Sequence, residues 1–257
     1  MTVPPCLETR ALVRSFGSVT VTDGVDFALY PGERCAIIGP NGAGKTTFIN
    51  LLTGRLRPTA GRVLLDGADV SRLSEAARTR RGLARTFQIT ALFPALTVRE
   101  NVFLSVAEAE GITGRLLRPA LSHHRHLARV DDVLEQVGLG EAAETQVQLL
   151  PYGQQRLLEL ALALAQKPRL LILDEPTAGI PLAEVDRVLR LIEALPAAIA
   201  VLLVDHDMDL VFRFARRIVV MAEGRVIADG LPATIAADEQ VRRLYLGEGS
   251  RGRHPAP

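Results

Sequence analysis

The stretch GPNGAGKTTF, residues 39–48, directly follows the apolar run CAII at residues 35–38. Its glycine, lysine and threonine spacing, Gly-x4-Gly-Lys-Thr, is that of a phosphate-binding P-loop placed between a strand and a helix. In such a loop, backbone N–H groups face the phosphates, the lysine adds a positive charge, and the threonine hydroxyl can bind Mg²⁺. The stretch therefore predicts an α/β domain that binds a nucleotide.

Composition excludes several classes of protein. The chain has 257 residues, 48% of them hydrophobic, enough to bury a large core. Its 30 Lys and Arg nearly balance 29 Asp and Glu, and they form no basic stripe, so a nucleic-acid partner has no electrostatic support. The two cysteines, Cys6 and Cys35, suggest neither a disulfide nor a zinc site. We expect no signal peptide and no membrane-spanning segment, so that membrane contact requires a partner protein.

Strands and helices alternate along the chain. Short β-like runs occur in residues 7–38, and the segment from about 97 to 149 is helical and polar, which predicts an inserted helical lobe. The other predicted elements are helices at 46–53, 154–165 and 182–195 and strands at 63–65, 83–87, 170–173 and 200–204. Strands that are apolar on both faces indicate a parallel sheet covered by helices, with ligands beyond its carboxyl ends.

Two of these strands end in side chains that can bind a metal ion or take part in catalysis. LLILDE, residues 170–175, ends in Asp174, which can hold Mg²⁺ through water, and Glu175, which can polarise an attacking water. VLLVDHDM, residues 201–208, contains His206, which could reach the terminal phosphate. A GTPase of the common type would need Asn-Lys-x-Asp, and the two lysines, Lys45 and Lys167, do not stand in that motif.

In this order and spacing the motifs resemble the ATP-binding cassette family, the ATPase subunits of ABC transporters. The resemblance covers nearly the whole chain and rests on these motifs: GPNGAGKT as Walker A, Gln88 in ARTFQ as the Q-loop, LPYGQQ as the signature, LLILDEP as Walker B, AGIP as the D-loop and His206 as the switch histidine. It implies two cassettes that pair head to tail around two ATP molecules. Each ATP site would combine the Walker motifs of one subunit with the signature of the other.

The family implies a RecA-like parallel-sheet core with an N-terminal antiparallel β subdomain and an inserted α-helical lobe. We therefore expect a single ABC ATPase domain over residues 1–246, followed by a disordered tail at 247–257. Within that domain the expected parts are the core at 1–88 and 168–230, the helical lobe at about 89–167 and a C-terminal helical tail at 231–246.

The family also implies roles for individual residues. The expected catalytic residues are Glu175, His206 and Gln88, and the expected ligands of the Mg²⁺ that accompanies ATP are Thr46, Gln88 and Asp174. The expected ATP-binding residues are Phe16, Gly39, Pro40, Asn41, Gly42, Ala43, Gly44, Lys45, Thr46 and Thr47. The expected signature residues, facing the partner's ATP, are Leu150, Pro151, Tyr152, Gly153 and Gln154. Phe16 would stack on adenine, with an ordinary core phenylalanine as the alternative.

The signature form YGQQ, the sequence DHDM at 205–208, the long segment 107–129 and the ending RRLYLGE are similar to the ATPases of branched-chain amino acid importers, the LivG type. The urea and short-amide importer ATPases remain an alternative. The implied partners are a second ATPase subunit, identical or different, membrane permease subunits and, indirectly, a solute-binding protein. The implied location is the cytoplasmic face of the bacterial inner membrane, where the chain would energise uptake of branched-chain or other hydrophobic amino acids.

Two prolines depart from the family pattern. Pro151 replaces the signature serine or alanine, and Pro181 replaces a polar D-loop residue. Pro151 offers no hydroxyl to the partner's ATP, although proline suits a helix start. We therefore keep open a subunit that binds ATP for regulation and hydrolyses it weakly, and a heterodimer whose opposite site is weaker. A soluble ABC protein of translation or DNA repair is disfavoured by the single cassette and balanced charge.

Overall fold

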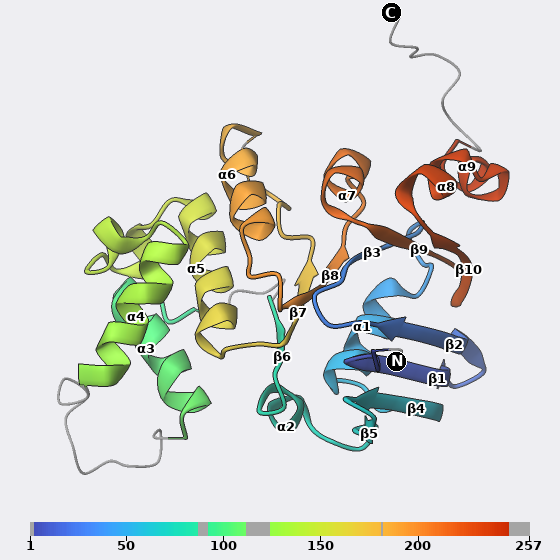
Figure 1. Ribbon diagram of the computed structural model, residues 1–257, viewed down its shortest axis with the longest axis horizontal. Helices are drawn as coiled ribbons and strands as arrows, with labels where there is room; N and C mark the ends of the chain where they lie inside the picture. Colours follow the sequence, from blue (N-terminus) through green and yellow to red (C-terminus); the bar gives the residue numbers. More distant parts are fainter. Residues whose placement is uncertain (1–2, 87–91, 112–123, 181, 247–257) are drawn as a thin grey trace, which may run out of the picture. The chain divides into compact units, whose positions relative to one another are not determined.

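The computed structural model describes residues 3–86, 92–111, 124–180 and 182–246 (Figure 1). The chain forms two compact units, the first from residues 1–29, 34–72 and 203–257, and the second from residues 30–33 and 73–202. Gln88, Pro181 and the predicted tail at 247–257 lie outside the described residues. The expectations for them therefore stay predictions.

The first unit contains an antiparallel sheet of order β2-β1-β4-β5. Its strands are β1 (Leu7–Phe16), β2 (Val19–Leu29), β4 (Ala60–Leu65) and β5 (Ala68–Asp69). Asp23 and Gly24 form a pair typical of turns, but they lie at an irregularity inside β2, where the pairing shifts register between Leu12↔Val25 and Arg14↔Thr22. A bulge of this kind bends a strand without ending it. The short runs expected here are therefore two long strands.

The same unit contains the strand that leads into the P-loop. β3 (Arg34–Ile38) pairs in parallel with β9 (Arg217–Ala222), which pairs in antiparallel with β10 (Arg225–Gly230). Helix α1 (Lys45–Thr53) follows the P-loop and ends at Gly54, which is left-handed with φ 84°, a common helix end. The remaining helices of this unit are α7 (Met208–Phe214), α8 (Pro232–Ala237) and α9 (Glu239–Leu246).

The second unit carries the strands that end in the predicted acids. Helix α2 (Glu75–Thr79) precedes β6 (Leu83–Arg85), which pairs in parallel with β7 (Leu170–Asp174). The strand order here is β8-β7-β6, and β8 (Ala200–Val204) begins in this unit and ends in the first. Every residue of these three strands is buried. This burial confirms the prediction of strands covered on both faces.

The helical lobe lies in the second unit, where α3 (Val98–Ala109), α4 (His124–Gln136) and α5 (Tyr152–Ala165) pack against one another (Figure 1). Two short 3₁₀ turns, Gly140–Ala142 and Val147–Leu149, connect α4 to α5, and α6 (Leu182–Glu193) follows β7. Thr97 and Glu100 form a capping box at the start of α3, which fixes where this helix begins.

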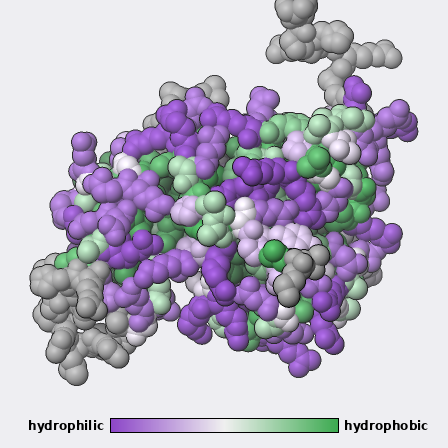
Figure 2. All heavy atoms as spheres, viewed as in Figure 1, coloured by the Kyte–Doolittle hydropathy of each residue, from purple (hydrophilic) through white to green (hydrophobic). Residues whose placement is uncertain are grey.

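Hydrophilic side chains cover most of the face drawn in Figure 2. In the described part of the chain, no helix is both long enough and apolar enough to cross a bilayer.

Candidate nucleotide site

The P-loop joins β3 to α1 and is braced by neighbouring backbone of the first unit. Gly44 is the N-cap of α1 with φ 94°, and a Cβ there would lie 2.5 Å from the Val21 carbonyl oxygen. The Gly224 N–H, in the turn between β9 and β10, donates to the Ala43 carbonyl at 3.0 Å. Glycine at position 44 is therefore required both by its left-handed backbone and by the closeness of β2.

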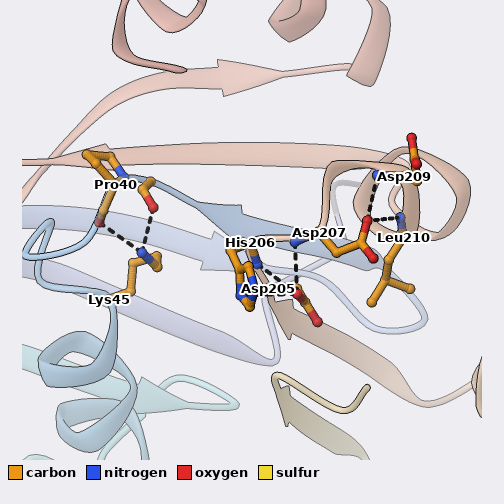
Figure 3. A network of polar contacts seen from close by, with 8 residues as sticks. Pro40, Lys45, Asp205, His206, Asp207, Asp209 and Leu210 are labelled. Atoms are coloured by element: carbon orange, nitrogen blue, oxygen red, sulfur yellow. Dashed lines mark hydrogen bonds and ion pairs between the residues drawn. The ribbon is translucent and has the colours of Figure 1, made fainter. Parts of the chain in front are cut away.

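Lys45 is folded back over the loop. Its ammonium group donates to the carbonyl oxygens of Gly39 at 2.6 Å and Pro40 at 3.0 Å (Figure 3). Asn41 and Thr46 are exposed beside it. The positive charge is thus held by neutral acceptors that a phosphate group, which forms stronger charge-assisted hydrogen bonds, can replace.

Phe16, at the end of β1, is 45% exposed and so is not a core residue. The guanidinium carbon of Arg14 lies 4.4 Å from the centroid of its ring, and Arg14 also donates to the Arg57 carbonyl at 2.9 Å. A cation over an aromatic ring is attracted by its negative face. Arg14 therefore covers the Phe16 ring, a contact that the sequence analysis did not foresee.

His206 follows β8 and projects from a fixed backbone. The buried Asp205 carboxylate accepts the N–H groups of His206 at 2.7 Å and Asp207 at 2.9 Å. Asp207 in turn caps α7, accepting from the N–H groups of Asp209 and Leu210 (Figure 3). The His206 side chain is 71% exposed. The arrangement holds the residue's backbone in place and leaves its imidazole accessible to a ligand.

In the second unit, β7 ends at the predicted acids. Asp174 is buried, and its Oδ2 accepts from Nη2 of Arg85 at 2.5 Å. Glu175 has φ 46°, which is rare for a residue other than glycine, and its carbonyl accepts from the Ala178 N–H at 3.1 Å in a tight turn. Strained backbone of this kind clusters at functional sites.

The signature motif contacts this turn. Pro151 is the N-cap of α5, and its carbonyl accepts from the Gln155 N–H at 3.1 Å, so proline suits the helix start here. The Tyr152 hydroxyl accepts from Arg156 at 2.6 Å and donates to the Ala178 carbonyl at 3.4 Å. The tyrosine of the signature thus links α5 to the D-loop of the same subunit.

Replacing Gly179 by alanine tests this link. Gly179 has φ 74°, and a Cβ there would lie 3.1 Å from the Tyr152 ring. Gly67→Ala is the matched control, because Gly67 has φ 77° with nothing within 4 Å. In both variants the left-handed backbone should lower the free energy of unfolding by about 1–2 kcal/mol. Gly179→Ala should unfold at a lower temperature than Gly67→Ala, because its Cβ also meets the Tyr152 ring. Equal losses would show that Tyr152 moves aside freely.

The C-terminal helix adds a residue that the sequence analysis missed. Burial raises the pKa of Tyr245, on α9, to about 12, against a smaller lowering by a hydrogen bond with the Gly39 backbone. Although Tyr245 as a whole is 37% exposed, its hydroxyl lies at Gly39, the first residue of the P-loop. Only the ending RRLYLGE marked this segment in the sequence, and nothing in it indicated which part of the fold it contacts.

Each unit thus carries part of the predicted site. The first holds the P-loop, Phe16 and His206, and the second holds Asp174, Glu175 and the signature.

The motifs also agree with known sequences. A family profile described as ABC transporter matches residues 22–178, more than half of the chain. The chain belongs to the ABC transporter family. A second profile, described as branched-chain amino acid ATP-binding cassette transporter, matches residues 225–250 of this ABC cassette, which include the C-terminal helices α8 and α9.

Two similar bacterial proteins match the cassette over nearly their whole length. It is 38% identical over 251 residues to the high-affinity branched-chain amino acid transport ATP-binding protein BraF of Pseudomonas aeruginosa, covering 95% of this chain and 98% of BraF. It is 39% identical over 253 residues to LivG of Escherichia coli K12, which has the same description and coverage. A nucleotide-free ATP-binding cassette from an ABC transporter matches with TM-score 0.83 and 28% identity, covering 95% of this chain and 100% of that chain. These matches confirm the predicted fold and the resemblance to branched-chain importer ATPases.

Proposed function

We propose that this ABC cassette is the ATP-binding and ATP-hydrolysing subunit of an importer for branched-chain or other hydrophobic amino acids. The observation that carries the ATPase role is a P-loop lysine that donates to two replaceable carbonyl acceptors, in a chain whose Glu175 follows β7 in a left-handed backbone conformation. The similarity to BraF and LivG supports the solute class.

In this proposal Lys45 exchanges the Gly39 and Pro40 carbonyls for phosphate oxygens, and the P-loop N–H groups bind the same anion. Phe16 stacks on adenine with the face of its ring that Arg14 leaves free. Glu175 accepts a proton from the attacking water, and His206 contacts the water or the terminal phosphate. Each role follows the family motif at that position.

The residues assigned to the metal fit Mg²⁺, because the Thr46 hydroxyl, the Asp174 carboxylate and the Gln88 amide oxygen are the hard oxygen donors that this ion prefers. The ion held by these residues together with ATP would supply positive charge that offsets the charge of the phosphates. Asp174 would hold it through water from the end of β7.

The signature residues Leu150–Gln154 imply a partner cassette, because they would complete the ATP site of a second subunit. We propose that the pair docks on membrane permease subunits at the cytoplasmic face of the inner membrane, with a solute-binding protein delivering the solute from outside.

One observation favours the alternative function, a regulatory subunit that binds ATP and hydrolyses it weakly. Pro151 presents neither an N–H nor a hydroxyl at the start of α5.

The solute class is tested by uptake. The cassette, expressed with its neighbouring permease and binding-protein genes, should drive entry of labelled leucine into reconstituted vesicles that contain ATP in their lumen and the binding protein outside, and Glu175→Gln should prevent it. Urea and acetamide serve as competing solutes in the same assay. Uptake of urea or acetamide in place of leucine would overturn the assigned solute while leaving the ATPase role intact.

A further inference from the structure

We propose that Arg85 is a positioning residue that supplies the positive charge required by Asp174 while no metal is bound. This inference rests on the proposed function, because Asp174 is there assigned to Mg²⁺. The motif ARTFQ contains Arg85, but the family resemblance implies a role only for its Gln88.

The contact between the two side chains is short and shielded from water. Nη2 of Arg85 lies 2.5 Å from Oδ2 of Asp174, and each side chain is only 4% exposed. The residues end neighbouring parallel strands, β6 and β7, with Arg85 in register with Ile172. The pairing is therefore built into the sheet and does not depend on a flexible surface side chain.

Thr86 makes a further contact with Asp174. Its hydroxyl accepts from the Asp174 N–H at 3.4 Å, and its own N–H donates to the Ile172 carbonyl at 3.0 Å. The end of β6 thus holds both the backbone and the carboxylate of Asp174. In the described part of the chain the carboxylate accepts through Oδ2, which leaves Oδ1 for the metal or its water.

There is too little space around the Asp174 carboxylate for water to solvate it if the Arg85 guanidinium were removed. A cavity beside Asp174, lined also by Thr86, Arg156 and Glu159, has a volume of about 20 Å³, which is room for roughly one water molecule. A buried carboxylate needs a paired charge, and breaking such a pair by removing one partner is strongly destabilising. Mg²⁺ can provide that charge when nucleotide is bound, and Arg85 provides it otherwise.

The test compares the purified full chain with Arg85→Gln, measuring thermal unfolding in EDTA, in ADP with EDTA, and in ADP with Mg²⁺. Arg156→Gln is the matched control, because it removes the guanidinium from a second pair, Arg156–Glu159 at 2.7 Å, whose side chains are 13% and 5% exposed. Both variants should unfold roughly 5–15 °C lower in EDTA. The addition of Mg²⁺ to the ADP sample should raise the unfolding temperature of Arg85→Gln by more than it raises that of the wild type. Arg156→Gln should show the wild-type rise.

Calorimetric ADP affinities give a second readout. The ratio of the dissociation constants in EDTA and in Mg²⁺ should be about tenfold larger in Arg85→Gln than in the wild type, as the loss of one compensating charge implies. If Arg85→Gln does not fold, Arg85→Met replaces it as the neutral variant and should show the same increase in the ratio. Arg85→Lys keeps the charge with fewer donors and should stay closer to the wild-type ratio. An unchanged ratio in the neutral variant would overturn the proposal.

Asp174→Asn separates this inference from the proposed function. If the wild type binds ADP equally with and without Mg²⁺, or if Asp174→Asn retains the full effect of Mg²⁺, the assignment of Asp174 to the metal fails. If Asp174→Asn loses the effect but Arg85→Gln behaves as the wild type, only the role of Arg85 fails.

Discussion

Replacing Lys45 by alanine is expected to weaken MgATP binding by about 100-fold, as measured by calorimetric titration. A hydrogen bond to a charged group contributes about 1.5–3 kcal/mol, and Lys45 can offer phosphate oxygens more than one. Part of this gain is offset, because the ammonium gives up the Gly39 and Pro40 carbonyls at 2.6 and 3.0 Å. The remaining difference of about 3 kcal/mol corresponds to roughly two decades in affinity.

Lys167→Ala is the natural control, since the chain has one other lysine. Lys167 lies in the second unit, its side chain is 62% exposed, and its ammonium is 3.4 Å from a Glu110 carboxylate oxygen. An exposed pair of this kind contributes little. We expect ATP affinity within about twofold of the wild type. Equal losses in the two variants would mean that Lys45 acts only through overall charge.

Replacing Glu175 by glutamine is expected to lower kcat for ATP hydrolysis by about 10²–10⁴, the usual contribution of a general base. Glutamine is nearly isosteric, so the tight turn closed by the Ala178 N–H should persist, and MgATP affinity should change by no more than a few-fold. The measurement is steady-state phosphate release by the assembled transporter, paired with nucleotide titration of the same preparation.

The control for this variant is Asp66→Asn. Asp66 also has a left-handed backbone, with φ 47°, but it lies in the turn between β4 and β5. The exchange of a carboxylate for an amide is the same in both variants, so a general effect of lost charge would slow both. We expect only Glu175→Gln to lose turnover. Loss of ATP binding in Glu175→Gln would instead assign this residue to the nucleotide site.

The sequence was sufficient to predict the parts of the fold that local pattern determines. The P-loop spacing located the start of α1, and the apolar runs located β7 and β8, because a strand buried on both faces carries few polar residues. The sequence did not show that the short β-like runs of residues 7–29 form two long strands, β1 and β2. A bulge inside a strand cannot be distinguished from a turn in a single sequence.

Contacts between distant segments were harder to predict. The Arg85–Asp174 pair depends on the register of β6 against β7, and the place of Tyr245 depends on how α9 packs near Gly39. Neither register nor packing can be read from spacing along one chain. Tyr152 was identified from the signature motif, but its bond to the Ala178 carbonyl required the structure.

The central claim is that this chain hydrolyses ATP as one of two paired cassettes in a transporter. Its most direct test is steady-state MgATP hydrolysis by the purified chain, alone and then with its neighbouring cassette and permease subunits. We predict turnover that rises on assembly and collapses when Glu175 is replaced by glutamine. ATP binding with no Glu175-dependent turnover in the complete assembly would contradict the claim and would identify the chain as a regulatory nucleotide-binding subunit.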